Sequence, residues 1–233
     1  MTFRDELERQ IWAFEDLGYV AATGFDKGHW YGGFYREESE GNYRSRFDSI
    51  DMSEGHPGIP FMLVIGESIV SVPRQIQLLN GGTWNCGGKP SLLEGGTMSH
   101  PFKAWLAVDV RLHAWPSGAC DWLVAEEVRA SGRQFATVCC GIAVAVTHPQ
   151  LLAQHKTLGC YASAHPSYSV PHIHEKPADW EVGLPKGKPN LYTHMVGRNC
   201  FHGGGGAVLS YASIISLESC VQGSLQRYLD RNR

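Results

Sequence analysis

The sequence has few charged residues and no run of basic ones. Lys and Arg number 20 against 23 Asp and Glu, which gives a formal net charge of −3 at pH 7 with histidine neutral. Charged residues make up 18% of the chain, below the roughly 25% of an average soluble domain. Because no basic block could follow a phosphate backbone, we expect no nucleic-acid partner.

The sequence also has no long hydrophobic run and no apolar leader. The longest apolar candidates, 61–65 and 141–146, have the length of core segments rather than the roughly 18 residues that a membrane span needs. Acidic residues already stand at Asp5 and Glu6, where a secretion signal would lead into its apolar region. We therefore expect a soluble, cytoplasmic protein without a membrane span.

The cysteines show no pattern of pairing. Seven of them stand at positions 86, 120, 139, 140, 160, 200 and 220. Their odd number, the absence of CxxC spacing and the adjacency of Cys139 and Cys140 suit neither a disulfide framework nor a zinc knuckle. We interpret them as free thiols in a reducing compartment.

The chain does have enough apolar material for one sizeable core, since 43% of its 233 residues are hydrophobic. Apolar runs and strand-like stretches predict four strands, at 59–66, 104–110, 158–162 and 190–196. Helical spacing predicts four helices, at 3–17, 121–131, 138–147 and 210–228. We predict a single domain over 1–233, of the α+β or α/β class, with a central mixed β-sheet flanked by helices.

Local capping signals support two of these helices. Thr2, with Asp5 three residues later, is a plausible cap for the first helix, and Gly18 stands where that helix would end. Thr137 is a plausible cap for the helix at 138–147. We expect the glycines at 203–206 to form a flexible hinge.

Several segments resemble a family of uncharacterised bacterial proteins. The resembling segments are ELERQ and LGY near the start, PFMLVI, WLAVDV, ASGRQFATVCCGIAVAVTHPQLL and the stretch 197–202. The resemblance covers about two thirds of the chain. It implies one fold across most of the sequence and assigns no reaction.

The stretch 165–202 holds five of the eleven histidines. His172 and His174 are two apart, so on a strand both rings would project from one face and could bind one ion. The spacing resembles a cupin pattern, which implies a divalent transition metal, zinc or iron, bound by His172, His174, His194 and Asp179. Glu175 is an alternative to Asp179 as fourth ligand or base.

The match to the cupin pattern is incomplete. Four residues separate His194 from Asn199, where the cupin pattern has three, and the predicted helices are too many for a minimal cupin. The alternative is that these histidines lie on a surface strand and bind nothing.

Other residues are candidates for binding a ligand. Trp30 and Tyr31 could stack on a ring-bearing molecule or pack the first helix onto the sheet. Asp109 ends a predicted strand, where ligands collect in open α/β sheets, although it could equally cap a turn. Asn199 and His202 flank Cys200, which is either a nucleophile with a histidine base or a buried thiol.

Two functions follow from these patterns. The first is a protein that binds a small molecule or a protein partner, since no GxSxG, HExxH or Rossmann signature is present. The alternative is a metal-dependent enzyme with a cupin-like histidine site.

Overall fold

A computed structural model describes residues 1–23, 47–80, 86–87, 101–116, 121–164, 169–175, 189–195 and 205–217. Its helices are α1 (Phe3–Asp16), α2 (Tyr19–Thr23), α5 (Val72–Leu79), α6 (Asp121–Ala130), α7 (Val138–Thr147), α8 (Pro149–His155) and the 3-10 helix η2 (Tyr161–Ser163). Its strands are β1 (Ile59–Ile65), β2 (Cys86–Gly87), β3 (Ala104–Trp115), β4 (Gln134–Phe135), β5 (Thr157–Gly159), β6 (Ser169–His174), β7 (Asn190–Met195), β8 (Gly206–Tyr211) and β9 (Ser213–Ser216). The predicted α+β class is confirmed.

The strands form one mixed sheet. Its order is β1-β3-β8-β5-β6-β7-β2, with β4 added to β8 and β9 added to β3. The pairs β5–β8 and β2–β7 are parallel, and the remaining pairs are antiparallel. The prediction of a mixed sheet is therefore confirmed as well.

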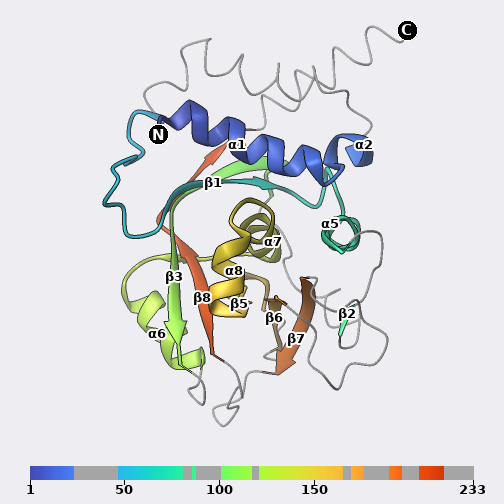
Figure 1. The fold of residues 1–233 in the computed structure, drawn as a ribbon. Coiled ribbons are helices and arrows are strands. Elements are labelled where there is room, and N and C mark those ends of the chain that lie inside the picture. Colours follow the sequence, from blue (N-terminus) through green and yellow to red (C-terminus); the bar gives the residue numbers. More distant parts are fainter. Residues whose placement is uncertain are drawn as a thin grey trace, which may run out of the picture.

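Strand β3 is shared between two parts of this sheet. Its first half pairs with β1 and β9, and its second half pairs with β8. The change of partner falls at Asp109, whose backbone takes the left-handed φ of 50°, opposite the break between β8 and β9 at Ala212. There the Ala212 amide donates to the Val108 carbonyl at 2.9 Å. The sheet turns a corner at this point, so that β3 runs from β1 down beside β8 (Figure 1).

Helix α7 is the centre of the core. All ten of its residues are buried, which fits its run of small and β-branched apolar side chains. It contacts β1 on one side and β6 on another, and helices α1, α5 and α8 pack around it (Figure 1). Buried side chains from α1 through β9 form one continuous cluster around this helix.

Helix α1 closes the core over β1. Thr2 and Asp5 form the predicted capping box, with the Asp5 amide donating to Thr2 Oγ1 at 3.2 Å. Its apolar face is buried as predicted, through Leu7, Ile11 and Phe14. Gly18, with φ of 86°, follows the helix end.

The predicted helix at 210–228 is wrong over its described part. Tyr211 ends β8, and residues 213–216 form β9. Apolar spacing over so short a segment does not reveal whether it is a helix or a buried strand, and here pairing with β3 decides for strand. Residues 218–228 lie outside the described ones.

Other boundaries also differ from prediction. Strand β3 continues five residues past 110, the stretch 161–163 is a 3-10 turn rather than strand, and α5 and β8 were not predicted. Gly206 belongs to β8 rather than to the predicted hinge, because it pairs with Trp115 there, and residues 203–204 of that hinge lie outside the described ones. A Cβ at Gly206 would collide with the Trp115 indole. Thr137 precedes α7 without capping it: its hydroxyl donates to Cys140 Sγ at 3.5 Å. Ser163 Oγ accepts the Val138 amide at 3.0 Å.

Four cysteines fall within the described residues, and for three of them the side chain is described as well. Cys139, Cys140 and Cys160 are buried free thiols, as predicted for them.

Among the helices that the structure describes, none is long and apolar enough to cross a membrane.

Candidate functional site

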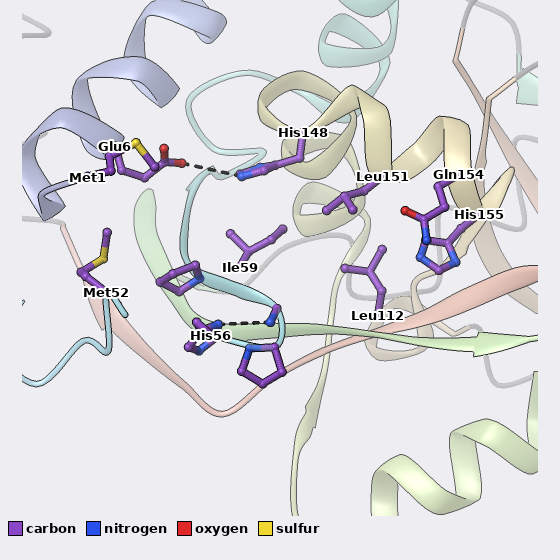
Figure 2. A pocket seen from close by; sticks show the side chains of 13 residues that line it. Met1, Glu6, Met52, His56, Ile59, Leu112, His148, Leu151, Gln154 and His155 are labelled. Carbon is purple, nitrogen blue, oxygen red and sulfur yellow. Dashed lines mark hydrogen bonds and ion pairs between the residues drawn. The ribbon is translucent and has the colours of Figure 1, made fainter. Parts of the chain in front are cut away.

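A pocket of about 470 Å³ lies between the start of α1, the loop before β1 and helix α8. Glu6 and His148 stand at one end, and Gln154 and His155 at the other (Figure 2). Ile59, Leu112 and Leu151 lie between these ends and give the pocket an apolar middle. The volume falls within the range of small-molecule sites, roughly 300–1,000 Å³. The sequence did not indicate this pocket, because its lining comes from segments far apart in the chain.

Glu6 is a buried carboxylate held by its own helix. Arg9 donates to it from Nε at 2.8 Å and from Nη2 at 2.6 Å, and Gln10 Nε2 donates at 2.7 Å. Burial raises the pKa of Glu6, but these hydrogen bonds and the Arg9 charge outweigh burial and leave that pKa below its ordinary value. The Gln10 amide also donates to the Phe61 carbonyl at 3.0 Å and accepts the Leu63 amide at 2.7 Å. Glu6 therefore belongs to a network that fastens α1 to β1.

His148 is neutral at pH 7. The Thr147 hydroxyl donates to the Ala143 carbonyl at 2.7 Å, so His148 Nδ1–H donates to Thr147 Oγ1 at 2.8 Å. Nε2 then accepts from Arg9 Nη2 at 3.2 Å. Burial, reinforced by the Arg9 charge, lowers the pKa of His148 to about 4. Its 3.7 Å contact with Glu6, drawn in Figure 2, is thus not an ion pair at neutral pH.

His56 connects the pocket to the corner of the sheet. Its Nδ1 accepts the Gly58 amide at 3.2 Å, and its Nε2–H donates to Asp109 Oδ1 at 3.2 Å. These two bonds hold the ring in one orientation. Both nitrogens are occupied, so His56 contributes the face of its ring to the pocket.

Gln154 and His155 have polar groups available to a ligand. Neither side chain makes a hydrogen bond with any residue of the described chain, and both line the pocket near the end of α8. Burial lowers the pKa of His155 below its ordinary value, so its ring is uncharged at pH 7. Glu6 is the acidic side chain of the lining, and Arg9 compensates its charge.

Asp109, predicted as a ligand residue at a strand end, lies instead in the middle of β3, where its side chain holds the corner together. It accepts from Arg111 Nε and from Arg133 Nη1, each at 2.7 Å. Arg133 also donates through Nη2 to the Asp109 carbonyl and through Nε to Ser210 Oγ at 2.9 Å. Burial raises the pKa of Asp109, but the hydrogen bonds and charges of Arg111 and Arg133 outweigh it and lower that pKa overall. The left-handed backbone is stabilised by these contacts.

His172 and His174 lie on strand β6, on the same face, with ring centroids 6.2 Å apart. His172 is fully buried, with Nδ1 at 2.9 Å from the Val170 carbonyl and Nε2 at 3.3 Å from Asp121 Oδ2. His174 Nδ1 lies 3.2 Å from Thr157 Oγ1. Sequence reasoning missed Asp121, which at the start of α6 has only the pattern of an ordinary helix N-terminus.

Of the remaining predicted ligands, Glu175 is the one whose side chain is described. Glu175 forms an ion pair with Lys156 at 2.9 Å. His194 lies on β7, where its backbone is paired with Val170, and its side chain is not described. Outside the described residues lie Trp30, Tyr31, Asp179, Asn199, Cys200 and His202. Within the part of the chain that the structure describes, no three His, Cys, Asp or Glu side chains are grouped to hold a metal ion.

No family model, curated protein or solved structure matches this chain.

Proposed function

We propose that this protein binds an uncharged small organic molecule, with an apolar body and a hydrogen-bonding group, in the pocket between α1, β1 and α8. The observation that carries the proposal is the pairing of an apolar middle with the unbonded side chains of Gln154 and His155 at one end. A few polar groups that fix orientation within an apolar lining are typical of small-molecule sites. Of the two partner classes predicted from the sequence, the pocket favours a small molecule over a protein.

The charge state of the lining supports an uncharged ligand. The negative charge of Glu6 is compensated by Arg9 at 2.6 Å, and the imidazoles of His148 and His155 have lowered pKa values. A ligand with a net charge would lose its hydration without gaining an opposite charge. A neutral amide, alcohol or heteroaromatic group could accept from Gln154 or exchange hydrogen bonds with His155.

The test compares probes of one size and different charge by NMR titration at pH 7. We expect benzamide and benzyl alcohol to shift the signals of Leu112, Leu151 and His155, and benzoate and benzylammonium to shift them at least tenfold more weakly. The variant Leu151→Trp fills the pocket and should abolish binding. Leu123→Trp, on the exposed side of α6, is the matched control and should leave it unchanged.

Equal binding of the charged probes would contradict the ligand class. Shifts that persist in Leu151→Trp would show that the probes bind elsewhere.

A further inference from the structure

Arg9 contacts both ionisable side chains at one end of the pocket without being part of its lining. Glu6 and His148 line that end. Arg9 Nε and Nη2 donate to the two carboxylate oxygens of Glu6 at 2.8 and 2.6 Å, and Nη2 lies 3.2 Å from His148 Nε2. Glu6 and Arg9 are three apart on α1, a spacing that places both side chains on one face of the helix.

A contact with helix α7 holds Arg9 in this position. Its Nη1 donates to the Thr147 carbonyl at 2.7 Å, across 138 residues of sequence. The planar guanidinium has five donors in a fork, whereas a lysine ammonium group has three donors at one point. Arginine can therefore reach the carboxylate, the imidazole and the carbonyl at once, and its charge stays fixed behind the pocket.

Arg9 supplies the positive charge that Glu6 needs. The Glu6 side chain is only 4% exposed, and a buried carboxylate without a positive partner is costly. An ammonium group of a ligand could act as that partner. Because Arg9 already does so, a cationic ligand would lose its hydration and gain little in return.

Arg9 also keeps His148 unprotonated. The lone pair of Nε2 accepts from Arg9, so a second ring proton would have to replace that contact. Burial, followed by the Arg9 charge, lowers the pKa of His148 to about 4, and Glu6 at 3.7 Å acts in the opposite direction. His56 and His155 line the same pocket from other elements.

We propose that Arg9 is a positioning residue that makes the pocket selective for uncharged ligands, by compensating Glu6 and by keeping His148 unprotonated. This inference rests on the proposed function, because it explains the selectivity of the same pocket. Arg9 acts through the two lining side chains and does not touch the ligand. Removal of its charge should therefore attract cations to the pocket rather than simply weaken it.

The experiment compares benzamide with benzylammonium by NMR titration at pH 8, where His148 is neutral. We expect Arg9→Gln to raise the affinity for benzylammonium relative to benzamide by about tenfold or more, because Glu6 has lost its partner. Arg9→Lys keeps the positive charge, and the double variant Glu6→Gln/Arg9→Gln removes both charges, so each should keep the preference for benzamide. Arg74→Gln, at a surface arginine that donates to Gln77, is the matched control.

A second measurement needs no ligand. In Arg9→Gln the pKa of His148, followed by NMR of its ring protons, should rise from about 4 towards the ordinary 6.5, because Nε2 is released and the nearby positive charge is gone. Arg74→Gln should leave that pKa unchanged. Binding of benzamide by the unaltered chain tests the proposed function, whereas these changes in Arg9→Gln test the role of Arg9, so the two failures are distinguishable.

Equal weakening of both probes in Arg9→Gln would show a merely structural role and would overturn the proposal. An unchanged pKa of His148 in that variant overturns it as well. If Arg9→Gln does not fold, Arg9→Lys and the double variant decide, since loss of the preference for benzamide in either contradicts selection by charge.

Discussion

His148 shows how one buried side chain couples the fold to acidity. Its ring receives a hydrogen bond from Arg9 across a sequence separation of 139 residues, and its other nitrogen is tied to Thr147. Nδ1 already carries the proton that it donates to Thr147, and the lone pair of Nε2 accepts from Arg9. A second ring proton, on Nε2, would therefore break the hydrogen bond from Arg9. Protonation of His148 therefore opposes the packing of α1 against the α7–α8 junction.

We predict that stability falls as the pH is lowered from 6.5 to about 4. The folded pKa of His148 is about 4 and the ordinary value is 6.5, so in this interval the unfolded chain binds the proton and the folded chain does not. The contribution of His148 to the free energy of unfolding is fully present above pH 6.5, and it declines by about 3 kcal/mol as the pH falls to 4. Urea unfolding followed by circular dichroism at pH 7 and pH 5 measures it.

His148→Gln should flatten this dependence, whereas His155→Gln, a half-buried control, should change it much less. An unaltered slope in His148→Gln would refute the assignment. Below about pH 4 the loss continues through the carboxylates of Glu6 and Asp109, because their folded pKa values lie below the ordinary ones.

At the level of elements, α1 is joined to the sheet through Gln10. The side-chain amide of Gln10 pairs with the Phe61 carbonyl and the Leu63 amide, as a neighbouring strand would. Helix α1 therefore covers part of the outer edge of β1 with one side chain.

We predict that Gln10→Met lowers the free energy of unfolding by about 2–4 kcal/mol. Methionine fills the volume but leaves a buried carbonyl and a buried amide of β1 without partners, and each costs about 1–3 kcal/mol. Gln77→Met on α5, where the glutamine accepts only from Arg74 at the surface, should change stability by less than about 0.5 kcal/mol. Urea unfolding compares them, and equal effects would contradict the role of Gln10.

The contact of α7 with the strands depends on Gly141. A Cβ at Gly141 would lie 2.6 Å from Cys160 Sγ and 3.0 Å from Ile173 Cγ1. Alanine normally stabilises a helix interior by about 1 kcal/mol over glycine. Here the close approach of the strands reverses the expected sign.

We predict that Gly141→Ala destabilises the chain by about 1–3 kcal/mol through overpacking. Cys160→Ala removes the crowded sulfur, so the double variant should be more stable than the sum of the two single effects implies. Thermal unfolding of the four proteins measures this coupling. Gly55→Ala, with nothing near its Cβ, is the neutral control. Additive effects would show that the two sites do not interact.

The sequence predicted those elements whose signals are local. The Thr2 cap, the apolar face of α1 and the buried run of β1 all lie within a few residues of one another. The second half of β3 was missed because Arg111 and His113 interrupt its apolar pattern, and its partner β8 is distant in the chain.

The candidate sites were harder to predict for the same reason. Asp121 and His172 are separated by 51 residues, and no spacing rule connects them. The pocket joins α1 to α8 through side chains whose contact depends on the whole core. Asp109 ends the predicted strand, but the actual strand β3 continues past it, and the Asp109 carboxylate stabilises the bend through Arg133.

At the scale of the whole molecule, the core is continuous across the described chain. One apolar cluster includes side chains from Leu7 to Leu217, and a smaller one lies between α6 and the outer face of β3 and β8. Because both clusters use the same two strands, neither can lose its packing alone.

We predict a single cooperative unfolding transition. Far-ultraviolet circular dichroism reports the backbone, and near-ultraviolet circular dichroism reports packed aromatic side chains such as Trp105 and Trp115. The two urea curves should coincide, as they do for one cooperative unit. Two separate unfolding midpoints would show that parts of the chain unfold independently. That result would contradict the prediction of one domain over 1–233.

The shared strand β3 has a consequence for how the chain is made. His113 on β3 contacts Ser210 across 97 residues of sequence, so at roughly 5–20 residues per second the ribosome needs roughly 5–20 s to supply that partner. During this interval the second half of β3 is an open edge in the nascent chain, which favours association with other chains. Arg111 and His113 place polar groups along that half, whereas the half that pairs with the earlier β1 is apolar. Arg111 and His113 interrupt the apolar pattern of β3, which made its second half hard to predict. The same two polar side chains disfavour association with other chains until β8 has been synthesised.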